Sequence, residues 1–132
     1  MKTITIETIE RNQMIDITSI VEEVVRETGI KDGVCYVLVP HTTAAVTINE
    51  NSDPDVPIDI LNALAKLIPH KDDYRHLEGN SDAHVKASLF GNMVTVIINS
   101  GKLVLGTWQS LFFCEFDGPR KRKIMIKTLG DK

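Results

Sequence analysis

The sequence predicts a single α+β domain, in which layers of mainly antiparallel β-sheet are combined with about three helices. The chain has 132 residues, a length that one compact domain accommodates. It contains 15 Ile and 12 Val, and β-branched side chains favour strands over helices. Strand-like runs are interrupted by segments whose apolar residues recur at helical spacing, and no repeat or linker divides residues 1–132.

Two strands and a helix are expected in the first 30 residues. Lys2–Thr8 alternates polar and apolar residues, which is typical of a half-exposed strand. Gln13–Ile17 is its expected hairpin partner. A helix follows, with Thr18 or Ser19 as the N-cap, and Gly29 ends it.

The middle of the chain predicts two strands and a longer helix. Gly33–Val39 is continuously apolar, which is typical of a central strand covered on both faces. Ala44–Asn49 is expected to be the next strand. Asp53 followed by Pro54 is a typical helix start, and Pro69 stops the helix. The apolar residues at helical spacing between them are Ile58, Leu61, Leu64 and Ile68.

A polar stretch from 70 to 81 precedes a short helix, and connections of this length are often functional. Asp82 is the expected cap of this helix, which continues to Leu89. His84 and Ser88 are four residues apart and share one helix face, whereas Val85 and Leu89 are expected to point toward the core.

Four further strands complete the predicted fold, with a turn at Asp117-Gly118-Pro119 before the last one. They are Met93–Ile98, Lys102–Leu105, Leu111–Phe116 and Lys123–Thr128. Cys35 and Cys114 each lie in an apolar run without a CxxC pattern, so we expect buried free thiols rather than a zinc site.

The composition limits the classes of function. A net charge of −3 argues against a general nucleic-acid binder and against a polybasic membrane protein. Apolar runs of about five residues are far shorter than the ~20 that span a bilayer. Met1–Glu7 alternates and carries an acid, unlike a signal peptide. We therefore expect a cytoplasmic protein.

Residues 74–86 hold the side-chain types of a binding site, including Arg75, His76, His84 and Lys86. The backbone amides of residues 82–84 at a helix start would favour a phosphate or a carboxylate. The alternative is a solvated surface loop in which Asp82 only caps the helix.

His41 directly follows a buried strand, where a side chain can line a cleft or serve as a hydrogen-bonded structural group. His41, His76 and His84 come from separate segments, and catalytic zinc sites often use such ligands. No HExxH motif is present, and the spacing of eight between His76 and His84 matches no standard zinc pattern. The sequence therefore leaves both proton transfer and metal ligation open.

Trp108, the only tryptophan, is expected either in the core or stacked on a flat heterocycle. Arg120 begins a run of four consecutive cations. The run predicts a solvated turn whose charges protect a sheet edge. Alternatively, Arg120, which follows a Gly-Pro turn, binds an anion.

The sequence has no Walker loop, no GxGxxG and no GxSxG, so no nucleotide or flavin cofactor is expected.

Three long motifs resemble those of the YjbQ-like family, the secondary thiamine-phosphate synthases. They are HTTAAVTINEN at 41–51, RHLEGNSDAHVKASL at 75–89 and LGTWQSLFFCEFDGPR at 105–120. The resemblance covers essentially the whole chain. It implies an α+β homotrimer with a secondary activity that joins a pyrimidine pyrophosphate to a thiazole phosphate, while the physiological role is unsettled.

Under this resemblance the ligand is a phosphorylated small molecule, and the candidate cofactors are Mg²⁺ or a transition metal such as Zn²⁺. The candidate catalytic or metal-ligating residues are His84, His41 and His76. The candidate substrate-binding residues are Arg75, Asn80, Asp82, Lys86, Ser88, Trp108 and Arg120. The alternatives are a non-enzymatic trimer whose histidines bind a metal or an anionic ligand, and a trimer without a small-molecule site.

Overall fold

The computed structural model describes residues 1–132 and contains eight strands and three helices, which confirms the predicted α+β class. The strands are β1 (Lys2–Glu7), β2 (Gln13–Asp16), β3 (Gly33–Leu38), β4 (Ala44–Glu50), β5 (Met93–Asn99), β6 (Lys102–Leu103), β7 (Gln109–Glu115) and β8 (Lys121–Gly130). The helices are α1 (Thr18–Thr28), α2 (Asp55–Leu67) and α3 (Ser81–Phe90).

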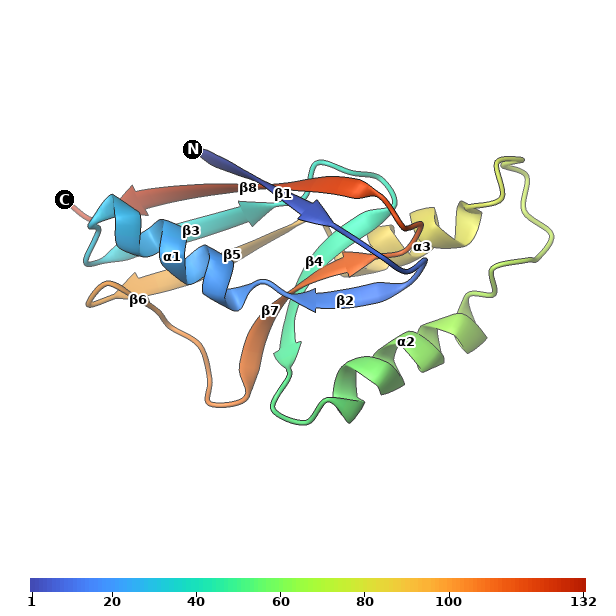
Figure 1. Cartoon of the computed structure of the whole chain (residues 1–132), viewed down its shortest axis with the longest axis horizontal. Helices are drawn as coiled ribbons and strands as arrows, with labels where there is room; N and C mark the ends of the chain where they lie inside the picture. The colour runs from blue at the N-terminus through green and yellow to red at the C-terminus, as the bar shows by residue number, and fades with distance from the viewer.

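The strands form two antiparallel sheets, one in the order β1-β8-β3-β5-β6 and one in the order β2-β7-β4 (Figure 1). The predicted hairpin between the first two strands is therefore wrong. Ile4 of β1 pairs with Ile124, whereas Ile15 of β2 pairs with Phe113. Alternation predicts that a segment is a strand, but it does not specify the partner, and here the chain changes sheets between β1 and β2.

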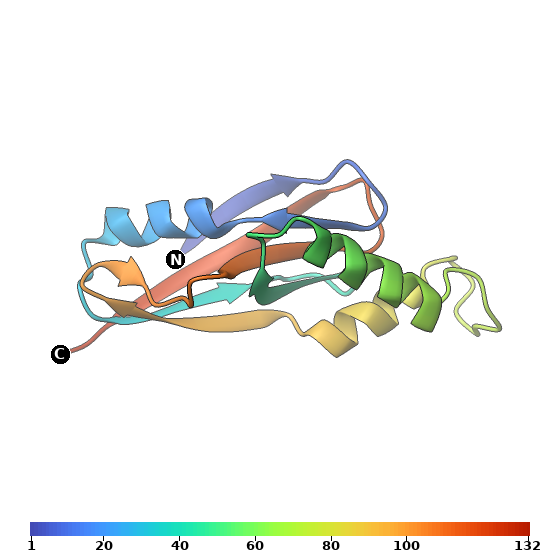
Figure 2. The ribbon, with the colours of Figure 1, turned by 90° about the horizontal axis from the view of Figure 1, so that it is seen from below.

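Alternation along the strands creates two cores on opposite faces of the three-stranded sheet. Val46 and Phe113 face the five-stranded sheet and α1, whereas Ala45 and Phe112 face α2 and α3. Figures 1 and 2 show α1 at one end of the molecule and the other two helices at the opposite end. The long connection from 68 to 80 extends beyond α2 and α3 (Figure 2).

The five-stranded sheet is covered on one face only. Cys35 and Val37 of β3 are fully buried, whereas Val34, Tyr36 and Leu38 on the other face are half-buried. The prediction that this strand is covered on both faces is therefore wrong for a single chain. Its apolar outer residues make up a face that nothing in the chain covers.

Helix α1 ends at Gly29 as predicted, but neither Thr18 nor Ser19 is its N-cap. Ile17 occupies that position. The Thr18 hydroxyl instead accepts a hydrogen bond from the backbone amide of Leu111 at 2.9 Å, which ties the helix start to β7. A β-strand neighbour that is distant in sequence therefore determines the role of this threonine.

Helix α2 begins one residue after Pro54, and the Asp53 carboxylate accepts a hydrogen bond from the Asp55 amide at 2.9 Å. Of its predicted apolar face, Leu64 is buried, but Ile58 is 53% exposed. The predicted face is therefore only partly correct, because α2 packs at the margin of the second core.

The buried face of helix α3 is not the face that the sequence predicts. Val85 and Leu89 are 41% and 68% exposed, although both were expected to point toward the core. The buried residues are Asp82, Ala83, Lys86 and Ala87. The two alanines pack in the second core with Phe112 and Phe116, and the two charged residues are buried because they pair with each other.

The predicted cap of α3 is wrong, because Asn80 occupies the N-cap position and Asp82 lies inside the first turn. The last strands and the cysteines agree with the predictions. The four last strands lie where they were expected, with β6 shorter and β8 longer than predicted. Cys35 and Cys114 are free and buried, and burial raises the pKa of the Cys35 thiol to about 11. None of the three helices has the length and the apolar character needed to cross a membrane.

Candidate functional site

Buried polar side chains gather where β7, β8, α3 and the loop after β1 meet. They are Thr8, Thr43, Asn80, Asp82, Lys86, Glu115 and Arg122. Burial of an ionised group is costly unless it is paired and hydrogen-bonded. All four charged members of this set have such partners, in two groups.

The first group is built on Glu115 and Arg122. The Nε and Nη2 atoms of Arg122 donate to the two carboxylate oxygens of Glu115 at 2.8 and 2.5 Å. The Thr8 hydroxyl donates to the same carboxylate at 2.7 Å, and Arg122 Nη2 also donates to the Thr43 hydroxyl at 2.8 Å. Burial alone would raise the pKa of Glu115, but the hydrogen bonds from Arg122, from the Asp117 amide and from Thr8 lower it.

The second group holds α3 against the loop between β1 and β2. Arg11 donates twice to the Asp82 carboxylate, and Lys86 Nζ lies 3.2 Å from Asp82 Oδ2 and 3.2 Å from Asn12 Oδ1. Burial works to raise the pKa of Asp82, but the bonds from Arg11 and Lys86 lower it. Lys86 is only 3% exposed. The charge of Lys86 is therefore paired inside the chain rather than exposed to solvent.

A hollow of about 560 Å³ lies beside these two groups. It is lined by residues of the β3–β4 connection, α3 and the beginning of β8, among them His41, His84 and Arg120. An adjoining hollow of about 490 Å³ shares both histidines and adds Ser88. The structure therefore brings together predicted site residues that lie far apart in the sequence.

His41 lies beside β8, just beyond the residue at which β3 stops pairing with that strand. The register that pairs Leu38 with Met125 puts Pro40 level with Lys123, but β3 ends at Leu38. The backbone amide of Lys123 donates to Nε2 of His41 at 2.9 Å instead of to a strand carbonyl. Burial and the positive charge of Arg122 lower the pKa of His41, so its ring is neutral at pH 7.

His84 contributes the second imidazole of the hollow. Its ring meets that of His76 edge to face, with 5.2 Å between the ring centroids. His76 itself is 3.5 Å from the Glu78 carboxylate. The Ser88 hydroxyl donates to the backbone carbonyl of His84 at 2.9 Å, which confirms that these two residues share one side of α3. No hydrogen bond within the chain engages the His84 ring, so both nitrogens are free for a ligand.

Asn80 and Arg120 are both oriented by Asp117. Asn80 Nδ2 donates to Asp117 Oδ2 at 2.8 Å, and Arg120 Nη2 donates to the same oxygen at 2.8 Å. Since a carboxylate cannot donate, this contact fixes which way the Asn80 amide points. Its Oδ1 atom is buried without a partner.

Arg75 and Trp108 lie away from the hollow. Arg75 is an exposed residue of the α2–α3 connection and does not line the hollow. Trp108 is 62% exposed, so the core-packing interpretation is wrong. It precedes β7, whereas Glu115 is at the other end of that strand, and seven strand residues span roughly 20 Å. Within one chain, Trp108 therefore provides no stacking surface for the hollow.

No three histidine, cysteine or acidic side chains of the chain are close enough together to hold a metal ion. The Nε2 atom of His41 is engaged by Lys123, and the nearby carboxylates of Asp82 and Glu115 are in ion pairs. The residues of one chain therefore do not fit a protein-held Zn²⁺ ion. The metal role of His41, His76 and His84 stays a prediction.

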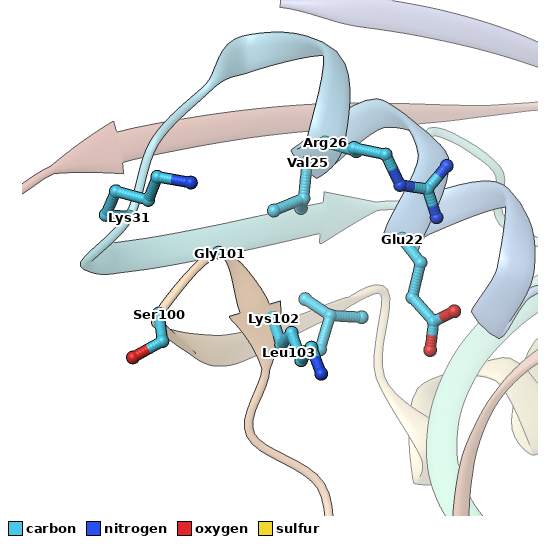
Figure 3. Close-up of a pocket in the computed structure, with 8 residues that line it drawn as sticks. All are labelled: Glu22, Val25, Arg26, Lys31, Ser100, Gly101, Lys102 and Leu103. Carbon is cyan, nitrogen blue, oxygen red and sulfur yellow. The ribbon is translucent and has the colours of Figure 1, made fainter.

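A separate hollow of about 470 Å³ lies between α1 and the β5–β6 turn (Figure 3). Arg26, Lys31 and Lys102 line it together with Val25 and Leu103. Its cations are exposed rather than buried, and none of the predicted site residues lies there. The hollow at His41 is therefore the candidate site.

Sequence reasoning missed two cations that shape this site. Arg122 belongs to the cation run for which a solvated turn is one prediction, yet it is two and four residues before the core residues Ile124 and Ile126. Strand alternation places it on their buried face, so the signal was present. Arg11 gave no signal, because its partner Asp82 is 71 residues away.

The fold and the site define a class: a small α+β protein with two antiparallel sheets and a cationic hollow that contains two histidines. The chain belongs to the UPF0047 protein YjbQ-like family, whose family model matches residues 2–131. This confirms the resemblance found in the three motifs.

Relatives from distant organisms cover nearly the whole chain. A UPF0047 protein of Methanocaldococcus jannaschii is 53% identical over 127 residues, which are 96% of this chain and 92% of that protein. The UPF0047 protein YugU of Bacillus subtilis is 50% identical over 98% of this chain and 99% of its own. A crystal structure of a yjbq/upf0047 family protein from Clostridium acetobutylicum has a TM-score of 0.96 at 52% identity, covering 98% of this chain and all of that one.

Proposed function

We propose that the hollow at His41 and His84 binds the phosphate or diphosphate group of a small heterocyclic molecule. We propose further that the protein catalyses, at a low rate, the condensation of a pyrimidine pyrophosphate with a thiazole phosphate to thiamine phosphate. The activity is inferred from the family resemblance. The anion-binding part is supported by the hydrogen-bond donors that the hollow contains.

Unused donors on one wall of the hollow carry the proposal. Arg120 binds Asp117 through Nε and Nη2, and Arg122 binds Glu115 and Thr43 through the same two atoms. The Nη1 group of each arginine is left without a partner in the chain, and both residues line the hollow. Guanidinium groups bind phosphate oxygens in charge-assisted hydrogen bonds.

The condensation requires little covalent chemistry from the protein itself. The bond between the pyrimidine methylene carbon and the pyrophosphate oxygen breaks, and pyrophosphate leaves with the electron pair. The thiazole nitrogen lone pair then forms the new carbon–nitrogen bond. Cations beside the leaving group stabilise its developing charge, a role for Arg120 and Arg122, while His84 can give a proton to pyrophosphate. A Mg²⁺ ion would arrive with the pyrophosphate, since it needs few protein ligands.

The second candidate is a non-enzymatic protein that binds an anionic small molecule in the same hollow. The position of Trp108 favours it, because no exposed aromatic ring of the same chain lies beside the histidines to hold a flat heterocycle. In this case pyrophosphate binds without turnover.

We also propose that the chain forms a homotrimer through the outer face of its five-stranded sheet. Ile97 and Leu129 on this face are 60% and 59% exposed, and both are level with Val34 in the register. Contiguous exposed apolar area on a sheet usually marks an interface.

The test measures thiamine phosphate formation together with pyrophosphate binding. We expect His84→Ala to abolish turnover with nearly unchanged thermal stability, while His70→Gln, outside the hollow, keeps it. Arg120→Ala should weaken pyrophosphate binding about tenfold, whereas Lys121→Ala should not, since the 79% exposed Lys121 side chain lies near Glu7. Equal turnover in His84→Ala would contradict the enzyme. Tight pyrophosphate binding without turnover would establish the second candidate.

A further inference from the structure

The two histidines of the hollow are not equivalent, because only one is hydrogen-bonded to the sheet. The backbone amide of Lys123 can only donate, so Nε2 of His41 must accept with its lone pair. A neutral imidazole carries one hydrogen, which in His41 must therefore sit on Nδ1. A flipped ring would direct a carbon at the amide, so the contact also fixes the ring orientation. No group of the chain accepts a hydrogen bond from Nδ1.

We propose that the Lys123 amide holds His41 in the Nδ1–H tautomer and that this Nδ1–H donates a hydrogen bond to the anionic group of the ligand. His84 is then the histidine of the hollow that exchanges protons. This rests on the proposed function only for the nature of the ligand. His41 then joins Arg120 and Arg122 as a neutral third donor to the anion and acts neither as a base nor as a metal ligand.

The surroundings of His41 support a neutral ring. Arg122 of β8 and Arg120, just before that strand, oppose a positive charge on it, and Glu115 of β7 acts in the opposite direction. His84 of α3 lines the same hollow. A lone pair that already accepts a hydrogen bond also resists protonation. Burial is the largest effect, and the net result is a lowered pKa.

Nuclear magnetic resonance of the protein labelled with ¹⁵N in its histidines tests the tautomer without any ligand. Long-range ¹H–¹⁵N correlations distinguish a protonated from an unprotonated ring nitrogen. We expect His41 to show a protonated Nδ1 and a bare Nε2 at pH 7, and to titrate below the ordinary histidine value of 6.5. A protonated Nε2 at pH 7 would overturn the proposal, even if pyrophosphate binds normally.

Two substitutions of His41 remove its Nδ1–H donor and its contact with the Lys123 amide one at a time. In His41→Gln the amide can reach the Lys123 N–H but has no donor at the Nδ1 position. In His41→Asn the amide nitrogen replaces Nδ1 but cannot reach Lys123. We expect His41→Gln to keep its thermal stability and to bind pyrophosphate about tenfold more weakly. His41→Asn should lose stability and recover part of the binding that His41→Ala loses.

The outcomes distinguish this inference from the proposed function. Unaltered pyrophosphate binding by His41→Gln would overturn the donor role while the proposed function stands. Failure of the unaltered protein to bind pyrophosphate would overturn the proposed function and the donor role together, and the tautomer would still be decided by the ligand-free spectra.

Discussion

Arg11 and Asp82 form a two-pronged ion pair, with Nη1 to Oδ2 and Nη2 to Oδ1 both at 3.0 Å. The Asp82 side chain is completely buried, and that of Arg11 is 27% exposed. Because Arg11 follows β1 and Asp82 lies in the first turn of α3, the pair connects the edge of one sheet to the helix that carries His84. The orientation of the candidate site therefore depends on a residue that does not line it.

Removal of Arg11 should destabilise the protein strongly. Arg11→Ala leaves the Asp82 carboxylate buried with Lys86 as its only cation, and breaking a buried pair on one side costs about 3 kcal/mol. Arg26→Ala is the matched control, because Arg26 pairs with Glu23 on the surface and such pairs contribute less than about 1 kcal/mol. Urea unfolding measures both. Equal losses in the two variants would contradict the role of the Arg11 pair.

Stability should fall most steeply below about pH 5, because the pKa values of Asp82 and Glu115 are lowered in the folded chain. The unfolded chain then binds protons more readily. The stabilisation is complete above the ordinary values of 3.8 and 4.5. It declines as the pH falls below them and is lost below the lowered pKa values. Urea unfolding from pH 7 to pH 3 checks this. Glu115→Gln should be less stable at pH 7 and lose less toward pH 3, and an unchanged slope would contradict this assignment.

A methyl group at Gly118 should disturb the site through the turn before β8. A Cβ atom there would lie 2.8 Å from Cγ of Glu115 and 2.9 Å from the Thr8 hydroxyl, and closer still to the Glu10 carbonyl oxygen. Gly118→Ala must therefore displace backbone, at a cost of about 2 kcal/mol.

The control for this substitution is Gly106→Ala, where the nearest atom is the end of the flexible Gln109 side chain, at 3.3 Å. Thermal unfolding and pyrophosphate binding should both decline in Gly118→Ala and change little in Gly106→Ala. A Gly118→Ala protein with unaltered binding would show that this turn does not position the hollow.

Local pattern predicted most strands and helix ends because those features depend on neighbours in sequence. Gly29 could be identified as a helix end from one residue. Helix α3 shows where this fails, since its buried face consists of alanines and paired charges rather than large apolar residues. Val85 and Leu89 match an apolar spacing that the fold does not use.

The candidate site could be predicted in part, because motifs identify residues but not their partners. His41, His84 and Arg120 do meet at one hollow. The ion pair of Arg11 could not be foreseen, since nothing in a linear sequence connects residues 11 and 82. The Nε2 contact of His41 depends on where β3 ends relative to β8, which only the sheet register determines.

Copies of the chain are expected to associate through the outer face of the five-stranded sheet. Ile97 is level with Val34 in the centre of the sheet, and Val34 is level with Leu129, so an apolar row crosses three strands. If this face is buried between copies, Ile97→Asp places a charge where water is excluded. Light scattering should then give one chain mass of 14.7 kDa for this variant and three chain masses for the unaltered protein. Ile9→Asp, at a 74% exposed residue outside the strands, should stay trimeric. A monomeric unaltered protein, or a trimeric Ile97→Asp, would show that this face does not join the copies.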